Sequence, residues 1–127
     1  MNSFVINYDS GYYTSIDFYK REIESILPRV SKEVFFNFMT LSQSDLETIF
    51  KGSANSDRVI LRSCRITTED ELDFSGPEYK TSYISIANTG DSGFFNWISP
   101  WTKFRNVVKA MGKTSLTDSL RTFNVHG

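Results

Sequence analysis

Three groups of residues in this 127-residue chain have types and spacings that could do chemistry. The stretch Gly90-Asp91-Ser92-Gly93 could present a nucleophilic serine if a histidine base lay beside it. The acidic run in residues 69–73 could hold Ca²⁺ through its carboxylates. Cys64 could act as a redox-active or metal-binding thiolate. Each group also has a structural interpretation, and the surrounding sequence decides between the two.

The Gly-Asp-Ser-Gly stretch resembles the sequence around the nucleophile of chymotrypsin-like proteases, but its context differs. That family has two glycines after the serine, whereas Gly93 is followed here by Phe94-Phe95. The single histidine, His126, lies next to the last residue, and no second triad element accompanies it. We interpret the stretch as a turn, because Gly, Asp and Ser are residues that turns favour. The sequence therefore predicts no catalytic residues and no enzyme.

The other two groups favour structural roles as well. The acidic run lacks the alternating Asp/Asn pattern and the glycine of an EF-hand loop, so it is interpreted as a solvated loop. One cysteine permits neither an internal disulfide nor a thiolate-rich zinc site. We expect Cys64 to be a buried structural residue. No phosphate-binding loop occurs, and we predict no metal and no cofactor.

Composition excludes further classes. The net charge of -1 and the pI of about 5.8 argue against a nucleic-acid partner, which normally requires a clearly basic domain. The first residues lack the basic start and apolar run of a secretory signal. No apolar stretch is long enough to span a membrane. We expect an intracellular protein of unknown compartment.

Short segments with the alternation of half-buried strands recur along the chain. Their first inward positions, Val34, Val59 and Ile84, follow one another at intervals of 25 residues, and Phe123 comes 39 residues after Ile84. Stacking similar units lets each short strand bury one face on a shared core. The alternative is a small α/β domain whose strands recur by chance.

The recurring segments also carry a sequence pattern. Val59-x-Leu61-x-x-Cys64-x-Ile66 and Leu120-x-x-Phe123-x-Val125 fit parts of L-x-x-L-x-L-x-x-N/C-x-L. Over about residues 30–127 the chain resembles leucine-rich-repeat proteins of the irregular, ribonuclease-inhibitor-like class. Its Phe-rich style is similar to that of anonymous ciliate-type members. Few of the leucines of this pattern are present, and Met39 and Thr89 stand at the position where the pattern has Asn or Cys. The resemblance implies an α/β fold, a short solenoid with parallel strands.

Helical patterns lie between and before the strands. A stripe from Ile16 to Leu27 predicts a helix, and residues 1–29 are expected to form a helical N-terminal cap. About three to four repeat units would then occupy residues 30–127. A capping box starting at Ser42 or Ser44 predicts a short helix that ends at Gly52. Residues 99–112 predict another helix.

The resemblance implies that side chains between the buried strand positions face outward. The partner-binding residues predicted on this basis are large or charged for such positions: Phe35, Phe38, Ile60, Arg62 and Tyr83. The alternative is that the N-terminal cap covers Phe35 and Phe38. The favoured function is a non-catalytic protein-binding or scaffold module, as a subunit or accessory protein of a larger assembly.

Two further features bear on partners. The basic aromatic stretch 94–113 could attach to a membrane surface as an amphipathic helix, although a convex-side repeat helix is favoured. The strand around Phe123 would leave an apolar edge at the C-terminus. Either the chain continues in a longer repeat protein, or a protein partner caps this C-terminal edge strand.

Overall fold

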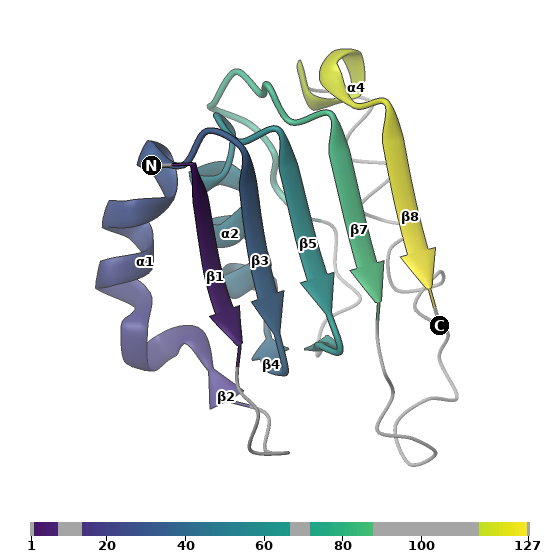
Figure 1. Cartoon of the computed structure of the whole chain (residues 1–127). Coiled ribbons are helices and arrows are strands. Elements are labelled where there is room, and N and C mark those ends of the chain that lie inside the picture. Colours follow the sequence, from purple (N-terminus) through teal and green to yellow (C-terminus); the bar gives the residue numbers. More distant parts are fainter. Residues whose placement is uncertain (1, 8–13, 67–71, 88–114, 127) are drawn as a thin grey trace.

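The computed structural model describes residues 2–7, 14–66, 72–87 and 115–126, and every structural statement below concerns these ranges. They form a mixed α/β arrangement around one sheet of five parallel strands (Figure 1). Across the sheet the order is β1 (Ser3–Asn7), β3 (Glu33–Asn37), β5 (Arg58–Arg62), β7 (Tyr83–Ala87) and β8 (Thr122–His126). The α/β class and the parallel strands are confirmed.

The strands pair in the register that the sequence spacing predicts. Val34 lies opposite Val59, Val59 opposite Ile84, and Ile84 opposite Phe123. The 39-residue interval before the last strand therefore changes only the connection, because the pairing continues without a slip. A slip of one residue would have moved every side chain of that strand to the other face.

The N-terminal region differs from the expected helical cap. Residues 3–7 form β1, which pairs with β3 and places Phe4 opposite Val34 and Ile6 opposite Phe36. The sheet therefore begins one strand earlier than we expected. Phe4 and Ile6 pack against the core, because this strand has the same inward alternation as the others.

The helices follow the predicted stripes and caps. The segment from Ile16 forms η1 (Ile16–Tyr19), α1 (Lys20–Ile26) and η2 (Leu27–Arg29). Helix α2 (Gln43–Gly52) begins after Ser42, whose hydroxyl accepts a hydrogen bond from Asp45 N while the Asp45 carboxylate accepts one from Ser42 N. This reciprocal pair is the predicted capping box. A short helix, α4 (Ser115–Ser119), precedes β8.

A second, smaller sheet forms where β3 and β5 end. It contains β2 (Thr14–Ser15), β4 (Met39–Leu41) and β6 (Arg65–Ile66), all parallel. Phe38 and Ser63 make the corner into β4 and β6, and both have left-handed backbone angles, with φ of 61° and 56°. They are 25 residues apart, so the same corner recurs in successive units.

The core lies between the five-stranded sheet and the helices α1 and α2, which cover one face of it (Figure 1). Phe36, Leu61, Ile23, Leu46 and Ile49 are fully buried there. The opposite face bears no helix from the described part of the chain (Figure 1). The outward positions of the strands are therefore the place where a functional surface can form.

Several predicted features fall outside the described residues. These are the Gly-Asp-Ser-Gly stretch, the acids at 69–71, the helix predicted over 99–112 and the basic aromatic stretch 94–113. Peripheral membrane attachment through that stretch stays a prediction.

Candidate functional site

The outward face of the five-stranded sheet is built from alternate residues of each strand. Its central row contains Val5, Phe35, Ile60, Ser85 and Asn124, one from each strand. The row at the start of the strands contains Ser3, Glu33, Arg58, Tyr83 and Thr122. Because parallel strands lie only about 4.8 Å apart, neighbouring members of a row form one continuous surface. We call these rows, together with Arg62, the sheet face.

Arg58 and Tyr83 form the first notable pair of the sheet face. They lie directly opposite each other on β5 and β7. The Arg58 guanidinium carbon is 4.4 Å from the centre of the Tyr83 ring, a cation–π contact. Arg58 is also opposite Glu33 on its other side, yet the guanidinium lies over the ring. Tyr83 thereby holds an exposed arginine in a defined position.

Arg62 and Phe35 form a second pair at the other end of β5. The Arg62 guanidinium carbon is 5.3 Å from the centre of the Phe35 ring. Phe35 lies on β3 opposite Ile60, so this contact crosses the ladder diagonally. The two arginines therefore lean towards opposite neighbouring strands, Arg58 towards β7 and Arg62 towards β3.

The remaining predicted site residues divide into two cases. Ile60 is at the centre of the sheet face but is only 9% exposed, so it offers less free surface than we expected. Its neighbours in the row, Phe35 and Ser85, are half-buried. Phe38 is half-buried at the corner after β3 and is separated from the face by the end of the strand. The structure thus brings Phe35, Ile60, Arg62 and Tyr83 together, and it sets Phe38 apart.

Sequence reasoning missed two residues of this surface. Arg58 was not selected, although its place in the register next to Tyr83 could have suggested it. Val5, with 59% of its surface exposed, lies on the strand that we did not anticipate. The signal for that strand was the short apolar run Phe4-Val5-Ile6, which is similar to the runs that begin at Val34 and Val59.

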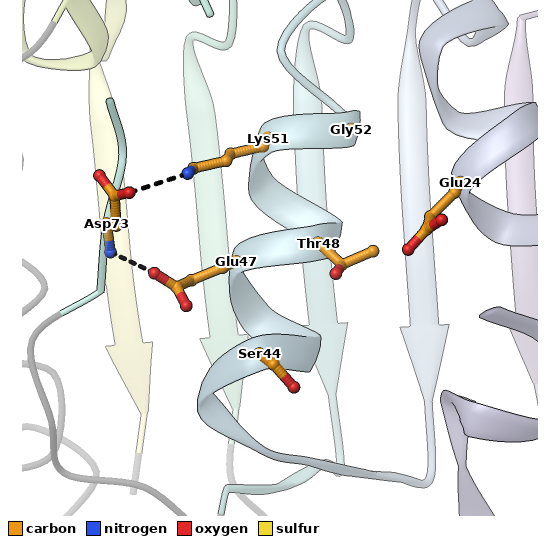
Figure 2. Close-up of a pocket in the computed structure, with 7 residues that line it drawn as sticks. All are labelled: Glu24, Ser44, Glu47, Thr48, Lys51, Gly52 and Asp73. Carbon is orange, nitrogen blue, oxygen red and sulfur yellow. Dashed lines mark hydrogen bonds and ion pairs between the residues drawn. The ribbon is translucent and has the colours of Figure 1, made fainter. Parts of the chain in front are cut away.

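A second candidate is a shallow groove of about 530 Å³ on the helix side (Figure 2). It is lined by Glu24, Ser44, Glu47, Thr48, Lys51, Gly52 and Asp73. Figure 2 shows that the side chains come from α1, from the outer surface of α2 and from the segment that contains Asp73. Three acids against one lysine give this groove a net charge of -2.

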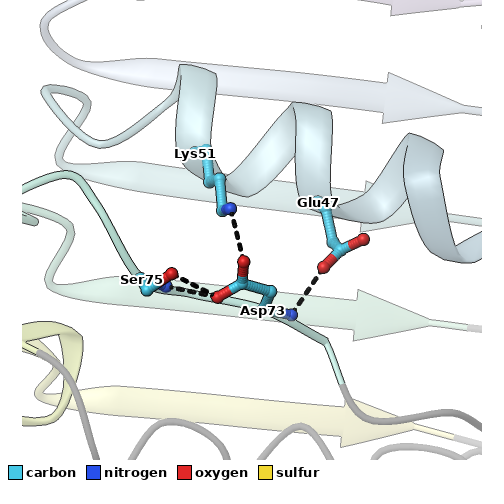
Figure 3. Close-up of polar contacts among 4 residues, drawn as sticks. All are labelled: Glu47, Lys51, Asp73 and Ser75. Atoms are coloured by element: carbon cyan, nitrogen blue, oxygen red, sulfur yellow. Dashed lines mark hydrogen bonds and ion pairs between the residues drawn. The ribbon is translucent and has the colours of Figure 1, made fainter.

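The charged groups of this groove connect Asp73 to α2 (Figure 3). Lys51 Nζ is 3.1 Å from Asp73 Oδ2, and Asp73 N donates to Glu47 Oε2 at 2.6 Å. Hydrogen bonds from the Ser75 hydroxyl and backbone N–H, followed by Lys51, lower the pKa of Asp73 to about 2. Glu47, Lys51, Asp73 and Ser75 bind one another. We therefore interpret the groove as the place where residues 72–75 attach to α2.

Cys64 is buried in the core, as predicted, and its thiol has a defined role there. Its Sγ donates towards the carbonyls of Phe36 at 3.6 Å and Arg62 at 3.4 Å. Burial raises the pKa of the thiol to about 12, so it stays protonated and unreactive at neutral pH. In the described ranges no three His, Cys, Asp or Glu residues gather as metal ligands would.

Comparison with protein-family models, with curated proteins and with solved structures gave no significant match to this chain. None of the helices in the described ranges has the length and apolar character needed to cross a bilayer. The function must therefore be argued from the surfaces of the chain itself.

Proposed function

We propose that this chain is a short leucine-rich-repeat-like solenoid whose sheet face binds a protein partner without catalysis. The repeat interpretation is supported by the strands Glu33–Asn37, Arg58–Arg62 and Tyr83–Ala87, which pair at the 25-residue spacing of the sequence. It is also supported by Cys64, which donates to backbone carbonyls from the Asn/Cys position of the pattern.

The composition of the sheet face is the observation that carries the binding role. Phe35, Tyr83, Arg58 and Arg62 gather over three adjacent strands, and each arginine makes a cation–π contact with a ring. Aromatic residues and arginine are enriched at protein interfaces and dominate their binding energy. A ring contact in the free protein also reduces the conformational entropy that an arginine loses when it binds.

A partner at the sheet edge is a further part of this proposal. Among the described strands β8 is at one end of the order, so its outer side is a position at which another strand could pair. A partner chain, or a following repeat, could pair there in parallel. The sheet face and this edge adjoin each other through Asn124 and Thr122.

Site-specific photo-crosslinking tests the binding role. A photoreactive phenylalanine analogue at Ser85 should capture a partner in cells, whereas the same analogue at Thr48 on α2 should not. Both positions are half-buried and lie on opposite faces of the molecule. The captured protein is then purified and titrated against the wild-type chain and against Phe35→Ser and Tyr83→Ser variants.

The proposal requires that both substitutions weaken binding while Thr48→Ala leaves the affinity unchanged. Equal capture at Ser85 and Thr48, with no effect of either substitution at the sheet face, would refute it. A melting curve of each variant separates lost contact from lost folding.

A further inference from the structure

The two arginines in contact with aromatic rings point to the chemistry of the partner. We propose that the sheet face binds an extended acidic segment of a protein, in which two carboxylates flank an apolar side chain. This inference rests on the proposed binding role of the same face and specifies what the face recognises.

Charge on the sheet face is the first step of the argument. Its ionised residues from the described ranges are Arg58, Arg62 and Glu33, which gives a net charge of +1 on a chain whose overall charge is -1. The groove on the helix side carries -2. An acidic partner is therefore attracted to the sheet face and repelled from the helix-side groove.

The availability of the guanidinium groups is the second step. In the described part of the chain the ion pair that forms is Lys51 with Asp73, on the other side of the molecule. Arg58 and Arg62 are both exposed, and among the described residues they make ring contacts and no ion pair. A ring contact engages one side of a guanidinium, which has five N–H donors, so donors remain that can bind a carboxylate in a fork.

Spacing along β5 is the third step. The two arginines are four residues apart on one strand, which places their backbone positions about 13 Å apart. Ile60 lies midway between them on the same face, next to Phe35. Because the two guanidinium groups lean to opposite sides of β5, an extended segment that crosses this strand obliquely can bring one carboxylate to each of them. The apolar residue between the two carboxylates then meets the centre of the sheet face.

Selection from a phage-displayed library of random dodecapeptides tests this inference on the intact chain. Peptides selected by the wild-type chain should be enriched in Asp or Glu at two positions that flank an apolar residue. Arg58→Glu with Arg62→Glu should shift the selection towards Lys and Arg, and should weaken a selected acidic peptide by about tenfold or more.

The matched control is Arg21→Glu with Arg29→Glu, which changes the net charge equally at exposed positions of α1 and η2. It should leave both the selection and the affinity unchanged. Far-UV circular dichroism checks that each double variant is folded.

The remaining outcomes separate this inference from the binding role. Selected peptides that need Phe35 and Tyr83 but show no acidic preference would overturn the acidic partner and leave the protein-binding role standing. Peptides that are insensitive to every change on the sheet face would overturn both. Binding of phosphatidylserine vesicles or duplex DNA that Arg58→Glu with Arg62→Glu abolishes, without acidic peptides in the selection, would assign the arginines to another anion and overturn the inference.

Discussion

Phe35 and Phe36 are neighbours on β3 with opposite environments, and replacing each by alanine tests which face of the sheet is the core. Phe36 is fully buried and its ring centre is 6.0 Å from that of Phe4. Phe35 is half-buried on the sheet face under the guanidinium of Arg62. The same chemical change is therefore made twice, one residue apart, on the two sides of one strand.

The expected costs differ because only one change leaves a cavity. Removing a fully buried phenylalanine side chain costs about 3–5 kcal/mol, since the lost transfer energy and the cavity add together. Phe35→Ala gives up roughly half of a buried side chain, about 1 kcal/mol. It also removes the contact with Arg62, worth about 0.5–1 kcal/mol at an exposed site. We expect a free energy of unfolding lower by about 4 kcal/mol for Phe36→Ala and about 2 kcal/mol for Phe35→Ala.

Urea unfolding followed by far-UV circular dichroism measures both free energies. The slopes with denaturant should stay close to the wild-type value, so that the midpoints can be compared directly. A larger loss for Phe35→Ala than for Phe36→Ala would refute the assignment of the faces, because a strand shifted by one residue exchanges its buried and exposed side chains. The sheet face as a binding surface would be lost with it.

The same unfolding assay checks three local features. Ser63→Gly should raise the free energy of unfolding by up to about 1 kcal/mol, because glycine adopts the φ of 56° without the strain of a side chain. Gly52→Ala should lower it by about 1–2 kcal/mol despite the better helix propensity, since the added Cβ would lie 3.0 Å from Leu27 Cδ1 and 3.1 Å from its Cβ. Ser42→Ala should lower it by about 1 kcal/mol through loss of the hydrogen bond to Asp45 N.

The sequence predicted β3, β5, β7 and β8 and their pairing, because both depend on local pattern, but it predicted neither β1 nor the second sheet. Alternation marks which side chains of a strand are buried, and equal spacing between Val34, Val59 and Ile84 implies equal register. Phe4 and Ile6 have the same pattern of two apolar residues separated by one position as Val34 and Phe36. That strand was missed because it lies 30 residues before the next one, outside the 25-residue period, and a helical stripe follows it.

The features of the sheet face that suggest a ligand could not be predicted in this way. Whether Arg58 turns to Glu33 or to Tyr83 depends on side-chain rotamers, which spacing does not encode. The left-handed angles at Phe38 and Ser63 were also unexpected, because neither residue favours them. They are imposed by the pairing of β3 with β5 and of β4 with β6 on either side of the corner.

Cys64 links stability to pH in a way that tests its buried position. Burial raises the pKa of the folded thiol from 9.0 to about 12. The unfolded chain therefore loses this proton first, so the stability that the neutral thiol contributes is complete below pH 9 and is lost as the pH rises to about 12. The loss should reach about 2 kcal/mol at about pH 10.5, and Cys64→Ala should lack it.

The two chains are compared at pH 8 and pH 10.5 under reducing conditions, so that effects common to both cancel. Tyr79, whose pKa burial raises to about 12, titrates in the same direction, and it is present in both chains. The stability advantage of the wild type over Cys64→Ala should therefore shrink at the higher pH. A constant advantage would mean that the thiol ionises equally in the folded and unfolded chains, which a fully buried side chain with two carbonyl partners does not allow.

Replacing Cys64 by asparagine tests the repeat interpretation. An asparagine amide can donate hydrogen bonds to the carbonyls of Phe36 and Arg62, so the Cys64→Asn variant should be more stable than the Cys64→Asp variant. An asparagine that is no better than aspartate would show that this position does not have the role of the repeat pattern.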